Sequence, residues 1–270
     1  MSDRVIAMFH PAIDDTIHAE IMTRLKQVEV EHNVRVLWAI ESGSRAWGFH
    51  SPDSDYDIRF IYVRPEGFYL SIDVEDQRDV IEYPIVDDVD LNGWDLRKAL
   101  RLLSKSNPGI VEWLHSPIVY SQRGDFQPLA LQLLKEFYSL EKGIYHYRSA
   151  AKTNYQQFLR GEMVKLKKYL YVLRPLLAVM WLEKYGTIAP IEFDRLRTVL
   201  DNPEVQQAID ALLEIKKTAS EKAEQKPMPV LQHFIEVELA RLEGFNDSTM
   251  NKMAMPRLNE VFRKVLGEIH

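Results

Sequence analysis

The spacing of apolar residues divides the chain into a first half that mixes strands with helices and a second half made of helices. Apolar residues recur every three or four positions over residues 12–32, which predicts an amphipathic helix. The β-branched, mostly apolar run 34–40 predicts a buried strand. Further elements are predicted as strands at 56–63, 80–86 and 89–91 and as a helix at 93–103 that Asn107-Pro108 ends.

From about residue 125 onward, helical spacing dominates the pattern. Helices are predicted at 127–138, 142–159, 162–184, 191–199, 204–222 and 230–242. This change of pattern predicts an α+β protein with two domains. The first, residues 1–124, combines strands with helices, and the second, residues 125–270, is all-α.

Composition excludes several classes of protein. The chain is 46% hydrophobic and 27% charged, which is typical of folded globular proteins. It has no cysteine, so disulfides, thiolate metal sites and cysteine nucleophiles are excluded. The eight histidines include no pair at i, i+4 spacing, so we expect no zinc site. The N-terminal residues lack a long apolar core and the run 176–182 is too short to span a bilayer, so we expect a cytoplasmic protein with no membrane partner.

The most informative segment runs from Gly43 to Asp57, between two predicted strands. Because side chains alternate along a strand, Asp55 and Asp57 project from the same face. Two neighbouring carboxylates repel each other, and a hard divalent cation such as Mg²⁺ or Mn²⁺ relieves that repulsion. An Asp-x-Asp pair on its own often does no more than cap a turn, so its surroundings decide its meaning.

A Gly-Ser turn precedes the two aspartates. Gly43 lets the backbone approach a phosphate closely, and the N–H groups that follow it, with the Ser44 hydroxyl, can bind an anion. Arg45 can add positive charge. Gly-Ser alone says little, but strand, Gly-Ser turn, short helix, Asp-x-Asp and strand together indicate a site that handles a nucleoside triphosphate.

Gly-Ser followed by Asp-x-Asp resembles the nucleotidyltransferase superfamily named after DNA polymerase beta. More closely, the chain resembles a family of predicted bacterial and phage nucleotidyltransferases that is associated with RNA repair in some genomes. The segments that carry this resemblance are 43–49, 51–62, 69–72, 92–100, 106–108, 112–114, 116–120 and 167–178. The resemblance implies that the first domain, residues 1–124, is a catalytic domain with a mixed sheet, and that the helical domain, residues 125–270, contributes to nucleotide and acceptor binding.

The superfamily uses a third carboxylate from an adjacent strand, and here Asp90 is the candidate, with Asp87 and Asp88 as rivals in a turn. The resemblance implies that two Mg²⁺ or Mn²⁺ ions are held by Asp55, Asp57 and Asp90. An acceptor hydroxyl would then attack the α-phosphorus of an NTP, ATP being the first candidate, and pyrophosphate would leave. Asp90 would act as, or beside, the general base.

The helical half contains a basic run. Residues 142–174 carry eight basic residues and one acidic residue, a net +7, which leaves −13 on the rest of a chain of net charge −6. Tyrosines interleave with this run, as in surfaces that hold single-stranded nucleic acid. Such runs are also commonly solvated helix faces, and the tyrosines can simply be core residues. The family resemblance favours a role in nucleotide binding for Lys168, Tyr171 and Arg174.

Three functions are compatible with these observations. The first is transfer of a nucleoside monophosphate to a hydroxyl of RNA or a tRNA-like end. The second keeps the chemistry but changes the acceptor to a small molecule or a protein, as in antibiotic- or antitoxin-type relatives. The third is a nucleotide- or RNA-binding module without turnover, which has little reason to keep a cluster of like charges at Asp55, Asp57 and Asp90.

Overall fold

The computed structural model describes residues 10, 12–218, 224–245 and 255–269, which form two compact units. The first unit combines described residues of Met1–Ala46, Asp55–Tyr138 and Asn251–His270. The second combines described residues of Trp47–Ser54 and Ser139–Met250. This division differs from the expected boundary after residue 124, because helix α6 (Phe126–Phe137) packs with the first unit.

A five-stranded mixed sheet forms the centre of the first unit. Its strands are β1 (Arg35–Glu41), β2 (Tyr56–Val63), β3 (Val80–Glu82), β4 (Val89–Asp95) and β5 (Val119–Gln122). Their order is β3-β4-β2-β1-β5, and β2 and β4 run parallel while the other neighbours are antiparallel. The central pair β2 and β4 therefore places the ends of two parallel strands side by side.

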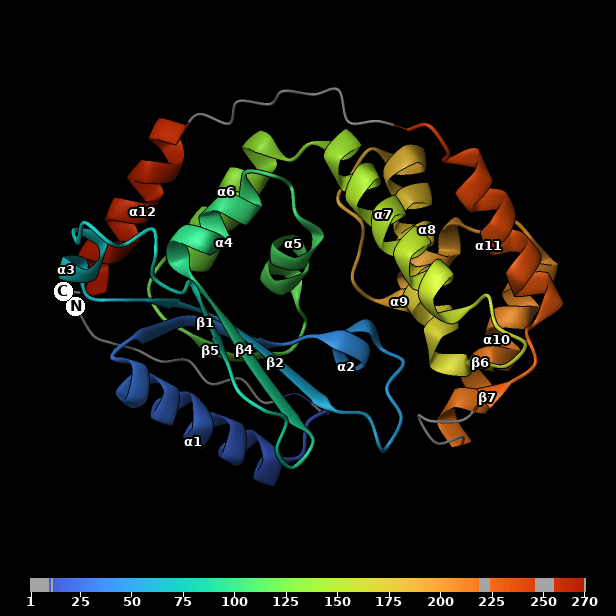
Figure 1. Ribbon diagram of the computed structural model, residues 1–270, viewed down its shortest axis with the longest axis horizontal. Helices are drawn as coiled ribbons and strands as arrows, with labels where there is room; N and C mark the ends of the chain where they lie inside the picture. The colour runs from blue at the N-terminus through green and yellow to red at the C-terminus, as the bar shows by residue number, and fades with distance from the viewer. Residues whose placement is uncertain (1–9, 11, 219–223, 246–254, 270) are drawn as a thin grey trace. The chain divides into compact units, whose positions relative to one another are not determined.

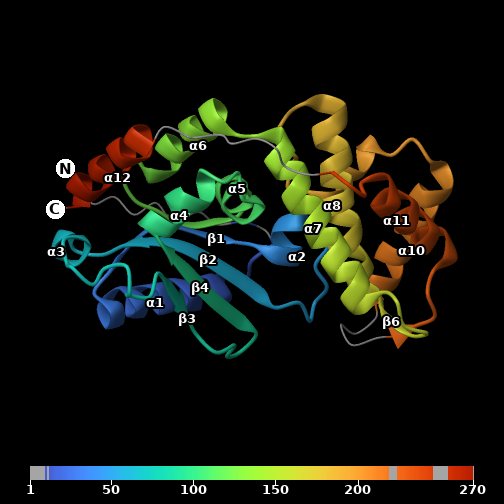
Figure 2. The same ribbon diagram turned by 45° about the horizontal axis from the view of Figure 1, so that its top comes forward.

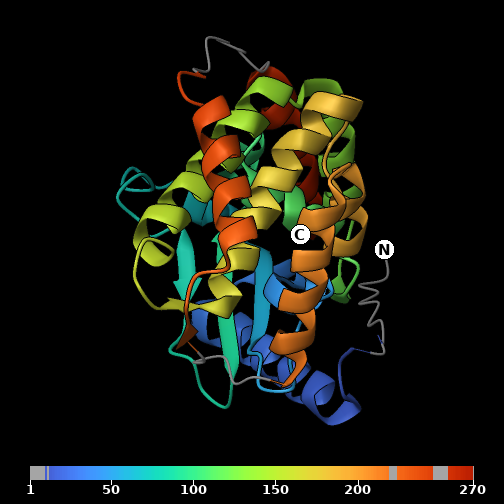
Figure 3. The ribbon, with the colours of Figure 1, turned by 90° about the vertical axis from the view of Figure 1, so that its right-hand side faces the viewer.

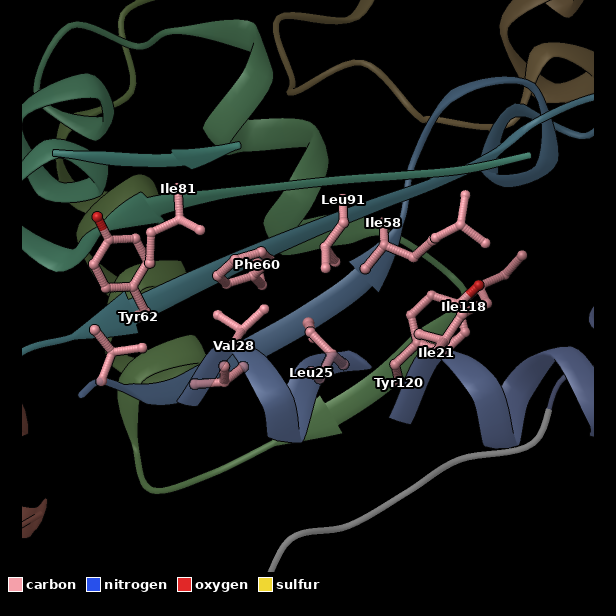
Figure 4. Packing of buried hydrophobic residues seen from close by; sticks show 14 of the residues in the cluster. Ile21, Leu25, Val28, Ile58, Phe60, Tyr62, Ile81, Leu91, Ile118 and Tyr120 are labelled. Carbon is pink, nitrogen blue, oxygen red and sulfur yellow. The ribbon is translucent and has the colours of Figure 1, made fainter. Parts of the chain in front are cut away.

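Helix α1 (Asp15–His32) covers one face of this sheet (Figure 1). The Asp14 carboxylate accepts from the Thr16 N–H at its start, a normal N-cap. Ile21, Leu25 and Val28 follow the predicted helical spacing and pack against the strands, as Figure 4 shows. On β2 the alternate residue Ile58 belongs to this core and is fully buried. Asp57 and Arg59 therefore project from the opposite face of the strand.

Helices α4, α5 and α6 lie on the other face of the sheet, with α12 against α4 and α6 (Figures 1 and 2). The other described helices of this unit are α2 (Gly43–Trp47), α3 (Glu66–Tyr69), α4 (Leu96–Leu103), α5 (Pro108–His115) and α12 (Met255–Ile269). The last residue of α2, Trp47, belongs to the second unit.

Two local predictions need correction here. The helix predicted from residue 93 starts at Leu96, because β4 continues to Asp95, whose carboxylate accepts from the Arg97 N–H and caps α4. Asn107-Pro108 ends one helix as predicted, but it also begins α5. The Asn107 side chain accepts from the Gly109 N–H, and Pro108 occupies the first turn, where no N–H is needed.

The second unit is a helical assembly (Figure 3). Its elements are α7 (Leu140–Phe158), β6 (Val164–Lys165), α8 (Leu166–Tyr185), α9 (Phe193–Leu196), η1 (Arg197–Val199), α10 (Pro203–Thr218), β7 (Glu224–Gln225) and α11 (Pro229–Arg241). Helices α7 and α8 pack along each other, and β6 pairs with β7. Residues 219–222 of the helix predicted at 204–222 lie outside the described residues. None of the described helices has the length and apolarity needed to cross a membrane.

Candidate active site

Two of the three predicted acidic residues are neighbours across the central strand pair. In the parallel register of β2 and β4, Asp57 lies opposite Asp90. Their side chains are 24% and 28% exposed, so both are reachable from solvent. Asp87 and Asp88 instead form the turn before β4, both with positive φ. Asp90, rather than its two rivals, therefore shares the site with Asp57.

An arginine that the sequence analysis did not consider lies between these carboxylates. The Arg59 Nη2 donates to Asp57 Oδ1 at 2.9 Å and to Asp90 Oδ2 at 2.7 Å. Its Nη1 donates to the backbone oxygens of Ile58 and Asp90, each at 3.0 Å. The period of two that places Asp55 and Asp57 on one face also includes Arg59, and that signal could have identified it.

The donor set matches hard cations in its chemistry. Asp57 and Asp90 offer carboxylate oxygens from adjacent strands, and the Arg59 guanidinium shows that this position accommodates a positive charge. Asp55 immediately precedes β2 and is partly buried. Within the described part of the chain, no three acidic or histidine side chains come together as a ready-made metal site. Metal binding by all three aspartates therefore requires Arg59 to yield some of its carboxylate contacts.

The Gly-Ser turn lies directly against Asp57. The Ser42 N–H donates to the Asp57 carbonyl at 2.8 Å, and Gly43 has a φ of +59°. A Cβ at Gly43 would lie 1.9 Å from Asp57 Oδ2, so only glycine lets the turn approach this carboxylate so closely. Ser44 follows in α2 and is 7% exposed. The turn predicted to bind phosphate is therefore built beside the predicted metal ligand.

A buried glutamate directly precedes the same turn. Glu41 is fully buried, and its carboxylate accepts from the Tyr120 hydroxyl at 2.5 Å and from the Asp57 N–H at 2.9 Å. Burial raises the pKa of Glu41 to about 7, although both hydrogen bonds oppose the shift. Sequence reasoning missed Glu41. The available signal was a charged residue at the end of an apolar strand, directly before the Gly-Ser turn.

Arg45 is buried rather than presented to solvent. Its guanidinium carbon lies 3.8 Å from the centre of the Tyr56 ring, and the residue is 8% exposed. Its charge also lowers the pKa of Glu41, although by less than burial raises it. These contacts stabilise the turn, and a phosphate contact by Arg45 remains a prediction.

The three residues predicted to bind nucleotide on α8 belong to the helical unit. Arg174 is 4% exposed, with its guanidinium carbon 4.5 Å from the Trp47 ring centre, and Tyr171 meets the same ring edge to face. The Lys168 ammonium lies 4.0 Å from the centre of the Phe158 ring and 5.0 Å from that of Tyr171. Aromatic contacts thus account for much of their surroundings, and a nucleotide contact by any of them remains a prediction.

The loop Trp47–Ser54, between the Gly-Ser turn and Asp55, also belongs to the helical unit. Besides the α8 contacts on Trp47, the Lys216 ammonium donates to the Phe49 carbonyl at 2.7 Å. The ring of Phe49 meets that of Phe193 edge to face. The helical unit therefore holds the loop whose two ends continue into the turn and into Asp55.

Comparison with known proteins shows the family of the chain. The chain is 46% identical over 252 residues to the uncharacterized protein YcgL of Bacillus subtilis (strain 168), a match that covers 92% of this chain and 96% of that protein. The crystal structure of a nucleotidyltransferase-like protein from Exiguobacterium sibiricum 255-15 aligns with 90% of this chain and 80% of its own, at 16% identity and a TM-score of 0.31. The model of the RNA repair pathway DNA polymerase beta family, RlaP, matches residues 17–264. That match includes every predicted site residue, and the chain is therefore a nucleotidyltransferase that belongs to the RNA repair pathway DNA polymerase beta family.

Proposed function

We propose that this enzyme transfers a nucleoside monophosphate from an NTP, ATP first among them, to a hydroxyl of RNA or a tRNA-like end. The observation that carries the proposal is the pairing of Asp57 and Asp90 across β2 and β4 beside the Gly43 turn. Membership of a family described by RNA repair supports RNA as the acceptor. The basic run 142–174 supplies positive charge that a phosphate backbone requires.

Each residue of the site has a defined task in this reaction. Asp57 and Asp90, together with Asp55, would hold divalent ions, Mg²⁺ or Mn²⁺. When bound, such ions neutralise phosphate charge and lower the pKa of the attacking hydroxyl. The turn at Gly43 and Ser44 holds the β- or γ-phosphate through backbone N–H groups and the serine hydroxyl.

The transfer step is an in-line displacement. The acceptor oxygen forms a bond to the α-phosphorus while the bond from that phosphorus to the bridging oxygen of the β-phosphate breaks. Pyrophosphate leaves with the electron pair of that bond. Asp90 accepts the hydroxyl proton, directly or through a water molecule.

The test is a transfer assay with each labelled NTP, Mg²⁺ or Mn²⁺, and separate pools of RNA, protein and small molecules. We expect label in RNase-sensitive product. Asp57→Asn should lower transfer by about 100-fold or more, because it removes charge stabilisation worth several kcal/mol.

The matched control is Asp87→Asn, which makes the same chemical change at a side chain 81% exposed in the turn before β4. It should retain wild-type transfer. Label in the protein or small-molecule pool would show that the acceptor is not RNA, while the proposed transfer chemistry would stand. Equal behaviour of wild type and Asp57→Asn with every pool would contradict the proposed enzyme.

A further inference from the structure

Arg59 makes more contacts than a surface ion pair needs. It donates to two carboxylates and two backbone oxygens, which lie on both strands of the β2–β4 pair. Its side chain is only 18% exposed. Exposed ion pairs contribute little because water competes for both partners, whereas here four acceptors hold the two terminal nitrogens of the guanidinium.

The guanidinium also uses oxygens that a metal ion would need. Nη2 contacts one oxygen of Asp57 and one of Asp90, which lie opposite each other on adjacent parallel strands. A divalent ion shared by these carboxylates competes with Arg59 for the same lone pairs. It also meets the repulsion of a fixed positive charge at close range.

We propose that Arg59 is a built-in counter-cation, which holds Asp57 and Asp90 together without metal and which a divalent ion must displace from at least one carboxylate to bind. The inference rests on the proposed function, because it concerns the same metal site. Arg59 acts as a positioning residue that sets the metal affinity of the site below that of uncompensated carboxylates. Metal loading then depends on what offsets the displacement, such as the phosphate oxygens of a bound NTP.

Removal of Arg59 has two opposing effects on metal affinity, and the structure indicates which one is larger. It removes the competitor and one positive charge, which favours metal binding. It also removes an orienting contact, which disfavours it. The backbone pairing of β2 and β4 fixes Asp57 opposite Asp90 without help from Arg59, so the orienting loss is the smaller effect. Tighter metal binding is the net expectation.

The experiment measures Mn²⁺ binding directly, by calorimetry and by electron paramagnetic resonance of free Mn²⁺, on metal-stripped full-length protein without nucleotide. Arg59→Met should bind Mn²⁺ about tenfold or more tightly than wild type, a difference of 1.4 kcal/mol or more. Arg59→Lys keeps the charge but not the two-pronged geometry, so its affinity should lie between the two. Asp57→Asn should lose this binding.

Arg24→Met is the matched control. Arg24 is 19% exposed, pairs with Glu20 and Asp87, and lies on α1, which covers the other face of the sheet. Its Mn²⁺ affinity should equal that of wild type. Should Arg59→Met fail to fold, Arg59→Lys still distinguishes a competing charge from a structural contact.

The outcomes separate this inference from the proposed function. Equal or weaker Mn²⁺ binding by Arg59→Met, with nucleotide transfer by wild type intact, overturns the inference alone. Tighter binding by Arg59→Met, with no transfer by wild type to any acceptor, upholds the inference and contradicts the proposed function. Binding that survives Asp57→Asn places the Mn²⁺ elsewhere and overturns the inference. Absence of Mn²⁺ binding in all variants, with nucleotide transfer by wild type intact, also overturns the inference alone.

Discussion

At the scale of single residues, the contact between Gly43 and Asp57 makes the site sensitive to one methyl group. Gly43→Ala should destabilise the protein by about 1–2 kcal/mol for the left-handed backbone and by about 1–3 kcal/mol more for the clash with the carboxylate. It should also lower transfer, because Asp57 must move. Urea unfolding and the transfer assay measure the two effects.

Gly124→Ala is the appropriate comparison for that change. Gly124 lies in the same unit with a φ of +61°, and a Cβ there meets only the far end of the Glu268 side chain at 3.1 Å. Gly124→Ala should lose only the stability that the left-handed backbone costs, and its nucleotide transfer should match that of wild type. If the two variants lost the same stability and the same activity, the contact with Asp57 would have no special role.

The buried Glu41 carboxyl predicts a pH dependence of stability. Its folded-state pKa of about 7 lies above the ordinary value of 4.5, so the folded protein binds this proton more tightly than the unfolded chain does. The resulting stabilisation is complete below about pH 4.5 and is lost as the pH rises through about 7. Relative to Glu41→Gln, wild type should lose about 3 kcal/mol of unfolding free energy across this window.

The measurement is urea unfolding of both proteins at a series of pH values in the presence of a chelator. The difference between them cancels the titration of all other groups. Tyr120→Phe removes a hydrogen bond that lowers the pKa of Glu41, so it should extend the window to higher pH. A difference between wild type and Glu41→Gln that does not change with pH would show that folding leaves the pKa of Glu41 at its ordinary value.

Sequence reasoning singled out the candidate-site residues that alternate along one strand or form a recognisable turn. Asp57 and Gly43 were found that way, and the strand register then brings Asp90 beside Asp57. Arg59 and Glu41 were missed because charged residues in or beside strands were interpreted only as possible ligands of metal or phosphate. Their role is to neutralise or hold another side chain, which depends on contacts across strands that one sequence does not specify.

At the scale of elements, prediction from the sequence is limited in the same way, because long-range contacts decide between local alternatives. Strand β2 was predicted with its observed bounds, because β-branched and aromatic residues dominate it even though Asp57 and Arg59 interrupt its apolar run. Helix α5 was missed because Asn107-Pro108 was interpreted only as a terminator. Asparagine as N-cap and proline in the first turn equally begin a helix, and only the packing of buried Ile110 and Leu114 decides between these readings.

Helix α10 provides an element-scale prediction through its last turn. Lys216 is 7% exposed and donates to the Phe49 carbonyl, so it ties the loop Trp47–Ser54 to the helical unit. Lys216→Met leaves this carbonyl without that donor, which should cost about 1–3 kcal/mol. Hydrogen exchange should accelerate in the loop more than in α7 or α8.

Lys217→Met provides the control at the next residue. Its side chain is 66% exposed and pairs with the exposed Glu214, so its removal should change stability by less than about 1 kcal/mol. Exchange in the loop should then match wild type. Equal acceleration in both variants would mean that the Lys216 bond does not hold the loop.

At the scale of the whole molecule, the division into units could not be predicted from composition. A composition shift marks one boundary, near residue 125, whereas the chain leaves the first unit at Trp47, returns at Asp55 and returns again for α12. Helix α12 belongs to the first unit because its apolar face packs against α4 and α6. Such long-range packing leaves no local signal in the sequence.

The charge distribution leads to the last prediction. The net charge of −6 conceals a run of +7 at 142–174, and Lys152, Arg160 and Lys165 of this run are exposed. If the run holds RNA phosphates, changing all three to glutamine should weaken binding of a single-stranded RNA and reduce its salt slope by about 2, at roughly 0.7 for each lost phosphate contact. The same change at exposed Arg195, Lys217 and Lys226 alters net charge equally within the same unit. Fluorescence anisotropy over a salt series separates the cases, since a uniform electrostatic attraction predicts equal slopes for the two variants, whereas a local RNA-binding surface predicts a reduced slope only for the first.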